Sequence, residues 1–218
     1  MTEITEENPP RQAWRQAVKK AMRKATRKEA LERYGTKKPV FDYRWEHVKA
    51  VVPLAVKLAK LMEADVEVVE AAAWLHDVRK GSGNNHPQKG AAFARRFLPE
   101  TDFPPQKIEA VAAAIADHMG LYLDQPLTSL ESQVLWDADK LAKLGITAAM
   151  HWLGGDVAKG NRHTTKDLIK DGRSTEWQNK TVESMHTAPA RAAAQKRLDA
   201  YNRLWDQLEA ELNGDDLE

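Results

Sequence analysis

Apolar residues recur at helical spacing along almost the whole chain of 218 residues. Successive segments place them three or four positions apart, and none shows the alternation of apolar and polar residues that marks a half-buried strand. The pattern predicts an all-α fold, a compact helical bundle with additional helices at its N- and C-terminal ends. Because a chain of this length buries roughly 70% of the surface that it exposes when unfolded, we expect one domain, 1–218, with one core.

Residues that cap or break helices give approximate limits for each helix. Helices are expected over about residues 10–33, 43–62, 66–80, 87–98, 108–119, 129–144 and 188–212. Gly35 ends the first of these, and Pro53 lies inside the second and should bend it. Thr128 and Glu131 form a capping-box pattern before the sixth. The polar segment 154–186 is expected to be a loop that closes over a site as a lid.

The sequence contains no cysteine, which excludes disulfides, a thiolate nucleophile and zinc sites built on sulfur. A metal ion would have to be held by imidazole and carboxylate groups. No apolar run approaches the roughly 20 residues needed to cross a bilayer, so no membrane partner is expected. Residues 1–10 are polar and acidic and lack the apolar stretch of a secretory signal, from which we expect a cytoplasmic protein.

His76 and Asp77 stand side by side at the inner end of an apolar predicted helix. Adjacent helical residues point about 100° apart, so both side chains reach one ion only when that ion lies close beside the helix. Aspartate is seldom buried without a partner, and a cation is a partner that both side chains share. A hydrogen-bonded pair at a helix end is the alternative, and the pair alone does not decide between the two.

Two further residues complete a known pattern: His47, which follows Trp-Glu, and Asp139, which precedes Lys-Leu. Together with His76 and Asp77 they resemble the HD superfamily of metal-dependent phosphohydrolases, whose pattern is a histidine on one helix, a His-Asp pair on another and an aspartate on a later one. The resemblance covers about residues 43–145. It implies that these four residues are metal ligands and that Asp77 is also catalytic, orienting or deprotonating the attacking water.

His86 and His118 match the extended pattern of the branch of this superfamily that binds two metal ions. Each also has an ordinary structural explanation. His86 precedes Pro87 and is a candidate cap of the helix that follows, and His118 lies on the apolar stripe of its helix, where a hydrogen-bonded core histidine is common. Taken with the other four residues, both are candidate metal ligands.

Asp137 competes with Asp139 for the fourth ligand position. The two residues lie about 200° apart on a helix, and the apolar face falls between them, so helical geometry does not choose. The resemblance favours Asp139, because it occupies the position before Lys-Leu in the family motif. Asp137 would then orient a histidine through a hydrogen bond.

Lys80 follows the His-Asp pair by one helical turn and is the second candidate catalytic residue, since its charge suits a phosphate group. A lysine near a helix carboxyl end is also favourable without any ligand. In HD nucleotidases that remove a five-prime phosphate a glutamate takes this position, so the sequence departs from that branch. Arg44, Lys140 and Lys143 are further cations beside the motifs, and most such residues are ordinary surface charges.

Imidazole and carboxylate ligands suit one or two divalent ions of Mn, Fe, Co, Ni, Zn or Mg. The resemblance implies that a metal-activated water hydrolyses a phosphoester or phosphoanhydride, with a small phosphorylated molecule, a nucleotide, as substrate. A di-iron centre that activates oxygen is an alternative with the same ligand set.

The segment 11–38 is strongly basic, with eleven Lys and Arg against two Glu. A basic helix that binds nucleic acid is therefore a third hypothesis. The same segment carries Trp14, Val18 and Met22 at helical spacing, which favours a packed helix with a solvated basic face. Nucleic acid is accordingly not the expected partner.

Overall fold

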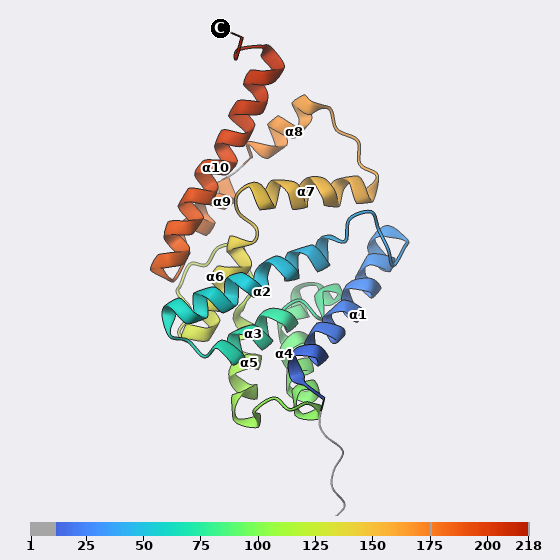
Figure 1. Ribbon diagram of the computed structural model, residues 1–218, viewed down its shortest axis with the longest axis vertical. Coiled ribbons are helices and arrows are strands. Elements are labelled where there is room, and N and C mark those ends of the chain that lie inside the picture. Colours follow the sequence, from blue (N-terminus) through green and yellow to red (C-terminus); the bar gives the residue numbers. More distant parts are fainter. Residues whose placement is uncertain (1–11, 175, 218) are drawn as a thin grey trace, which may run out of the picture.

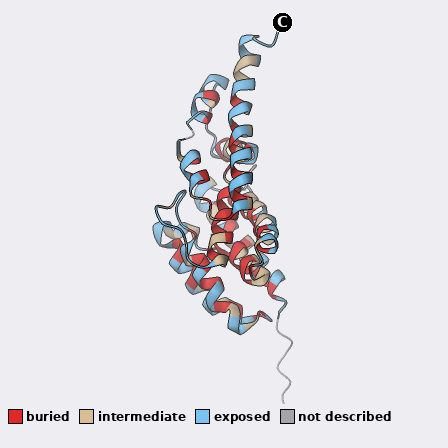
Figure 2. Cartoon of the chain, turned by 90° about the vertical axis from the view of Figure 1, so that its left-hand side faces the viewer, coloured by how far each residue is buried: buried red, intermediate tan, exposed pale blue. Residues whose placement is uncertain are grey.

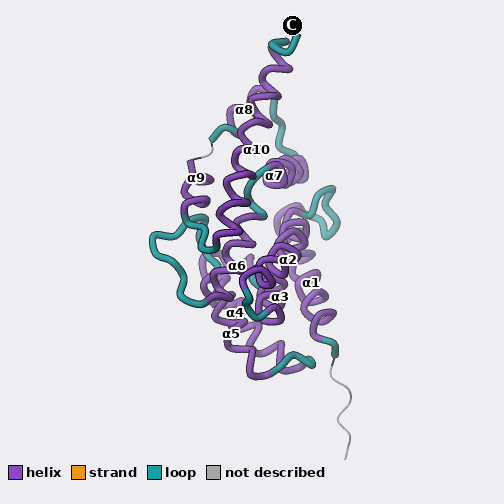
Figure 3. The backbone as a smooth tube through the Cα atoms, turned by 60° about the vertical axis from the view of Figure 1, so that its left-hand side comes forward, coloured by secondary structure: helices purple, strands orange, loops and turns teal. Residues whose placement is uncertain are grey.

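The structure is a computed structural model that describes residues 12–174 and 176–217, and over these residues it confirms the all-α prediction (Figure 1). Figure 3 shows helices and loops but no strand over these residues, and within them the only pairing of β type is an isolated bridge between Gln12 and Thr101. The helices are α1 (Trp14–Tyr34), α2 (Tyr43–Met62), α3 (Val66–Leu75), α4 (His86–Phe97), α5 (Ile108–Asp117), α6 (Leu130–Leu141), α7 (Ile146–Lys159), α8 (Thr165–Gly172), α9 (Glu176–Glu183) and α10 (Ala188–Asn213).

Helices α2, α3, α5 and α6 pack against one another at the centre, with α4 against α5 and α1 against α3. The long helix α10 packs on α6, α7, α8 and α9, so the C-terminal helices form a second group at one end of the central bundle (Figure 1). Buried residues are concentrated where the helices meet (Figure 2). The structure therefore has a central bundle with helices added at both ends of the chain, as the sequence predicts.

Helix α3 lies in the middle of this bundle because its side chains are small. Ala71, Ala72 and Ala73 are fully buried, and residues without atoms beyond Cβ let neighbouring helix backbones approach closely. The segment after α3 therefore emerges in the interior, where His76 and Asp77 are 0% and 2% exposed. The apolar sequence of α3 is thus what carries two polar residues into the core.

Helix α1 differs from the prediction at its start and agrees at its end. The predicted start at residue 10 lies outside the described residues, and the described helix begins at Trp14. The Trp14 amide donates to a carboxylate oxygen of Asp102 at 2.6 Å, a cap supplied from far along the chain. Gly35 ends the helix in the left-handed conformation, and its amide donates to Leu31, as its position predicts.

Helix α3 ends at Leu75, five residues before the predicted limit at 80. The backbone then forms tighter turns, in which the amides of Val78 and Lys80 each donate to the carbonyl three residues before. The turn and the following six-residue 3₁₀ segment Lys80–Asn85 reverse the chain into α4. His76 and Asp77 therefore lie on a turn just beyond the helix.

Two predicted caps are wrong by one residue. Ser129 caps α6 and accepts a hydrogen bond from the Ser132 amide at 3.1 Å. Glu131 accepts instead from the amide of Asp65, and so it holds the start of α3 against α6. Likewise His86 is the first residue of α4 and follows the cap position, because the preceding 3₁₀ turns already continue into the helix.

The prediction of a loop over residues 154–186 is wrong. The segment contains the end of α7 and the short helices α8 and α9. Thr164 and Asp167 form a capping box at the start of α8, and Ile169 is buried, so one capped turn and one apolar contact suffice for a helix that is polar elsewhere. Within the described residues, no helix is long and apolar enough to cross a membrane.

Candidate metal centre

The six predicted ligands meet in one buried cluster. His47 comes from α2, His76 and Asp77 from the turn after α3, His86 from the start of α4, His118 from the end of α5, and Asp139 from α6. All six are buried, none being more than 5% exposed. Every helix of the central bundle except α1 supplies at least one member, directly or from the turn at its end, so the folded bundle itself sets the geometry of the cluster.

The first half of the cluster is built around Asp139. One carboxylate oxygen of Asp139 lies 2.9 Å from Nε2 of His47 and 3.8 Å from Nε2 of His76. The second oxygen of Asp77 lies 3.4 Å from the same His76 nitrogen and 3.9 Å from the His47 nitrogen. Potential ligand atoms of His47, His76 and Asp77 all lie within 4.8 Å of one another. This spacing accommodates a single ion among the four side chains.

The second half of the cluster shares Asp77 with the first. Its other carboxylate oxygen lies 3.5 Å from Nε2 of His86 and 3.6 Å from Nε2 of His118. The two histidine nitrogens are themselves 3.2 Å apart. Asp77 therefore faces two groups of ligand atoms, one with each carboxylate oxygen, which is the arrangement expected of a carboxylate between two metal sites.

Three of the histidines are oriented by the same local hydrogen bond. Nδ1 of His76, His86 and His118 pairs with the backbone carbonyl three residues before, at 2.8, 2.7 and 2.6 Å. Because a carbonyl only accepts, Nδ1 carries the proton, and in the neutral ring Nε2 presents a lone pair to the cluster. Second hydrogen bonds of this kind are what fix metal-binding histidines in proteins.

Several inward-facing atoms have no protein partner. Nε2 of His76 and one oxygen of Asp77 are buried and form no hydrogen bond with the described residues. Buried polar atoms are almost always paired, so a group of unpaired acceptors marks a site for a ligand. Imidazole nitrogens and carboxylate oxygens are the donor set of a divalent transition metal, and the residues present fit such an ion.

The carboxylates of the cluster are held ionised. Burial alone would raise the pKa of Asp77, but the Arg44 guanidinium outweighs it and holds that pKa well below its usual range. For Asp139 burial is likewise outweighed, by Lys140 and Lys143. Burial lowers the pKa of His47 to about 3. Charged carboxylates and, at His47, a neutral imidazole are the protonation states that bind metal.

Four cations surround the cluster. Arg44 forms an ion pair with Asp77, and Lys80 lies 3.2 Å from the same carboxylate. Lys143 donates to Asp139 at 2.6 Å, and Lys140, only 1% exposed, donates to Asp139 and to the carbonyl of His118. These four cations, with His86, His118 and Asp139, line a cleft of about 440 Å³. A positively charged opening onto a metal cluster suits an anionic substrate.

Asp137 lies on the opposite side of α6 and does not join the cluster. Its carboxylate accepts hydrogen bonds from the amides of His186 and Thr187 at 2.9 and 2.8 Å, and from the Thr187 hydroxyl at 2.8 Å. It does contact a histidine, as predicted, but His186 is not a member of the cluster. Asp137 therefore fastens the segment that begins α10 to the central bundle.

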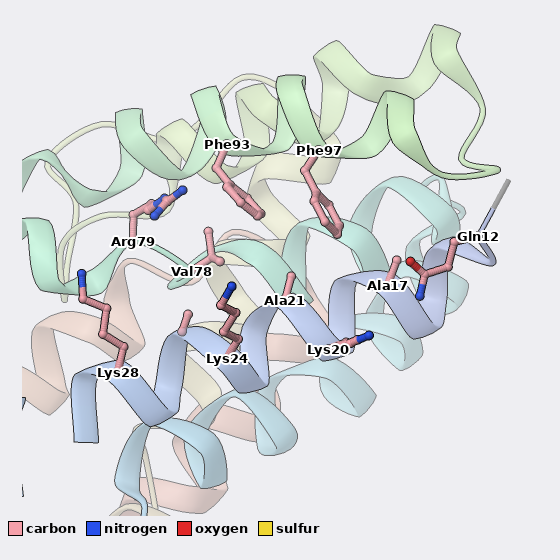
Figure 4. Close-up of a pocket in the computed structure, with 11 residues that line it drawn as sticks. Gln12, Ala17, Lys20, Ala21, Lys24, Lys28, Val78, Arg79, Phe93 and Phe97 are labelled. Carbon is pink, nitrogen blue, oxygen red and sulfur yellow. The ribbon is translucent and has the colours of Figure 1, made fainter. Parts of the chain in front are cut away.

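A separate groove lies between α1 and α4 (Figure 4). Phe93 and Phe97 project from α4 toward α1, and Lys20, Lys24 and Lys28 stand along the edge. The groove has a volume of about 440 Å³, and no member of the metal cluster lines it. The basic helix therefore packs by an apolar face and exposes its lysines, in agreement with the spacing of its apolar residues.

Comparison with known proteins agrees with the cluster. The sequence model of the HD domain matches residues 44–144, the segment that carries all six cluster residues. The tRNA (cytidine(56)-2'-O)-methyltransferase of Thermoplasma volcanium is 30% identical over 151 aligned residues, which cover 53% of this chain and 44% of that protein. The chain therefore spans less than half the length of this curated relative.

Solved structures share the fold over nearly the whole chain. Bacillus subtilis YpgQ, in complex with ADP, is 21% identical with a TM-score of 0.64, covering 90% of this chain and 98% of that chain. An HD-superfamily hydrolase from Bacillus thuringiensis is 20% identical with a TM-score of 0.64, covering 92% and 99%. Another from an uncultured Thermotogales bacterium is 22% identical with a TM-score of 0.61, covering 90% and 92%.

The matched segment, the fold and the cluster agree with one another: residues 44–144 match the HD domain and carry the buried cluster. This segment includes the His-Asp pair whose surroundings predict the resemblance, and solved structures described as HD-superfamily hydrolases share the fold.

Proposed function

We propose that this protein is a metal-dependent phosphohydrolase that cleaves a phosphoester or phosphoanhydride bond of a nucleotide. The observation that carries the proposal is the sharing of Asp77 between two groups of histidine Nε2 atoms, inside a cleft lined by four cations. Hydrolysis forms a bond from a water oxygen to phosphorus, breaks the bond from phosphorus to the leaving oxygen, and delivers a proton to the leaving group. The cluster and the cations meet the two needs of that reaction, an activated water and charge compensation.

His47, His76, Asp77 and Asp139 would hold one divalent ion, and Asp77, His86 and His118 a second. When bound, such an ion would lower the pKa of a coordinated water to about 7 and offset charge on the phosphoryl oxygens. The protein's own contribution is rigidity. Because the rings of His76, His86 and His118 are fixed by backbone carbonyls, their ligand atoms need little rearrangement when the site is filled.

Lys80 is placed to act on the substrate. Its Nζ atom lies 3.1 Å from Nε2 of His86 and 3.2 Å from Asp77, and its side chain remains 32% exposed in the cleft. Lys140 and Arg44, by contrast, are buried in ion pairs with the carboxylates. We assign Lys80 to a phosphate oxygen of the substrate, and Arg44 and Lys140 to holding Asp77 and Asp139 in place.

A nucleotide is the substrate that fits best among small phosphorylated molecules. The cationic cleft suits a phosphate chain, and the structurally similar YpgQ was solved in complex with ADP. The methyltransferase relative supports no transfer of its activity, because the chain corresponds to less than half of that protein. Four cations around the cluster favour an anionic substrate over the oxygen chemistry of a di-iron centre.

The proposal is tested with the purified protein loaded in turn with Mn²⁺, Co²⁺, Ni²⁺, Zn²⁺, Fe²⁺ and Mg²⁺. Release of phosphate or pyrophosphate from nucleotides, cyclic nucleotides and p-nitrophenyl phosphate is expected with at least one metal, and His76→Ala and Asp77→Ala should abolish it. His163→Ala is a matched control, because His163 contacts Asp156 outside the cluster. A wild-type protein that is inactive on all substrates with every metal, or one that holds two irons and consumes oxygen, would overturn the proposal.

A further inference from the structure

A second cavity adjoins the metal centre on the side of the C-terminal helices. It has a volume of about 480 Å³ and is lined by residues of α2, α7, α8, α9 and α10 and of the turn after α6. Tyr43, Arg44, Leu121 and Lys143 line both this cavity and the cationic cleft. The two spaces are therefore neighbours across these four residues. A ligand that places a phosphate at the metals has room for the rest of its body here.

Tyr43 forms the wall between the two spaces. Its ring stacks on the cluster residue His47, with ring centres 6.1 Å apart and an angle of 6°. On its other side the ring meets His151 of α7 edge to face, again at 6.1 Å. One aromatic side chain thus lies between the metal cluster and the cavity, so that the two are about one ring apart.

The lining of the cavity is rich in flat side chains. Trp152 of α7, Trp177 of α9 and Tyr201 of α10 line it together with His151. Aromatic rings on several sides of a cavity suit a planar ligand, since ring faces attract other π systems by stacking. The volume lies within the range of roughly 300–1,000 Å³ typical of small-molecule sites.

Gln178 is a buried polar residue in the lining of this cavity. The side chain lies in the cavity wall on α9, and the residue is 1% exposed. Its Oε1 atom accepts no hydrogen bond from any described residue. Leaving a buried acceptor unpaired destabilises a protein by about 1–3 kcal/mol, so such an atom in a cavity is expected to meet a ligand donor.

From these features we propose that the cavity binds the nucleobase of the substrate and that Gln178 accepts a hydrogen bond from the exocyclic amino group of that base. This inference rests on the proposed hydrolysis of a nucleotide and names which nucleotides are preferred. Bases with an exocyclic amino group are adenine, guanine and cytosine. A base with a carbonyl in place of the amino group would direct a lone pair at Oε1 of Gln178 and be repelled. A base with neither group would leave Oε1 unpaired.

Nucleoside binding tests the inference without any catalysis. The chelator-treated protein is titrated by calorimetry with three matched pairs: adenosine and purine riboside, guanosine and inosine, and cytidine and uridine. At least one amino-bearing nucleoside should bind about tenfold more tightly than its partner, the effect of one hydrogen bond to a buried group. Gln178→Met, similar in size and lacking the acceptor, should remove that difference.

Gln207→Met is the matched control, because Gln207 is exposed on α10. It should leave the preference unchanged, and the melting temperature of each variant verifies that it is folded. The inference is overturned when no nucleoside binds, or when Gln178→Met keeps the full preference, the result expected if a bound water pairs with Oε1. Hydrolysis is measured in parallel: activity without nucleobase preference contradicts this inference alone, and nucleoside binding without hydrolysis by any metal form contradicts the proposed function alone.

Discussion

Nε2 of His86 and Nε2 of His118 lie 3.2 Å apart, although neither ring has a proton to place between them. Both rings are fixed with Nδ1 donating to a backbone carbonyl, and burial lowers the pKa of His118 to about 4 and the pKa of His86 in the same direction. Two lone pairs at this distance repel unless a cation lies near them. Lys80 donates to His86 from one side, and Asp77 completes the group on the other.

Metal content therefore tests whether this pair holds a second ion. The wild-type protein, loaded with Mn²⁺ and desalted, should retain two ions per chain, while His86→Ala and His118→Ala should each retain about one, because they remove one of three ligands. Elemental analysis measures the ratio of metal to protein. His163→Ala should match the wild type, and equal metal content in all four proteins would show that the two histidines bind no ion.

Asp139 and Asp137 should behave differently although both are fully buried on α6. Asp139→Asn removes a negative ligand and should lower activity at least about 100-fold with loss of metal. Asp137→Asn disrupts the bonds to His186 and Thr187 and should lower the free energy of unfolding by about 2 kcal/mol while metal is retained. Urea denaturation and elemental analysis separate the two effects. Loss of metal in Asp137→Asn would show that Asp137 is a metal ligand and contradict this assignment.

The sequence predicts the central bundle and its six polar residues well, because both depend on regular spacing. Apolar periodicity sets the helices, and the His-Asp pair stands out against an apolar helix. Asp139 and Asp137 mark the limit of that reasoning. On a helix buried on all sides both face protein, and only the neighbouring helices determine which one meets His47 and which one meets Thr187.

Other features arise from tertiary contacts alone. Lys140 reads as an ordinary surface cation in the sequence, yet it is buried because Asp139 and the carbonyl of His118 satisfy its ammonium group. Helices α8 and α9 are too polar to show clear periodicity and form where α10 provides a partner. No motif identifies Gln178, whose significance rests on the unpaired oxygen in a cavity.

Lys80 should contribute to substrate binding and little to metal binding. Lys80→Ala removes one charge-assisted contact to phosphate, for which we expect kcat/KM to fall about 10- to 100-fold, corresponding to about 1.5–3 kcal/mol. Metal content should stay at the wild-type level. Lys89→Ala, an exposed lysine on α4, is the control for a general loss of charge. An unchanged kcat/KM in Lys80→Ala would place this lysine outside the reaction.

The metal-free protein should become less stable as pH falls from about 6.5 toward 4. The pKa values of His47 and His118 are lowered by burial to about 3 and about 4, against 6.5 in the unfolded chain. Below pH 6.5 the histidines of the unfolded chain therefore bind protons, while His47 and His118 of the folded protein stay unprotonated. The stability that is present above pH 6.5 is lost as the pH falls toward the pKa values of the folded protein. The loss is up to about 1.4 kcal/mol per pH unit for each ring.

The loss of stability between pH 6.5 and 4 is due to the histidines. The pKa values of Asp77 and Asp139 are lowered from 3.8, so these carboxylates lose their contribution to stability only below that pH. Melting temperatures of the chelator-treated protein between pH 7.5 and 4.5 measure the effect, and His47→Gln should reduce the slope by removing one titrating ring. Bound metal should shift the loss to lower pH, since protons must then displace the ion from the same nitrogens. A melting temperature that is constant over this range in both metal-free proteins would contradict neutral, buried imidazoles in the cluster.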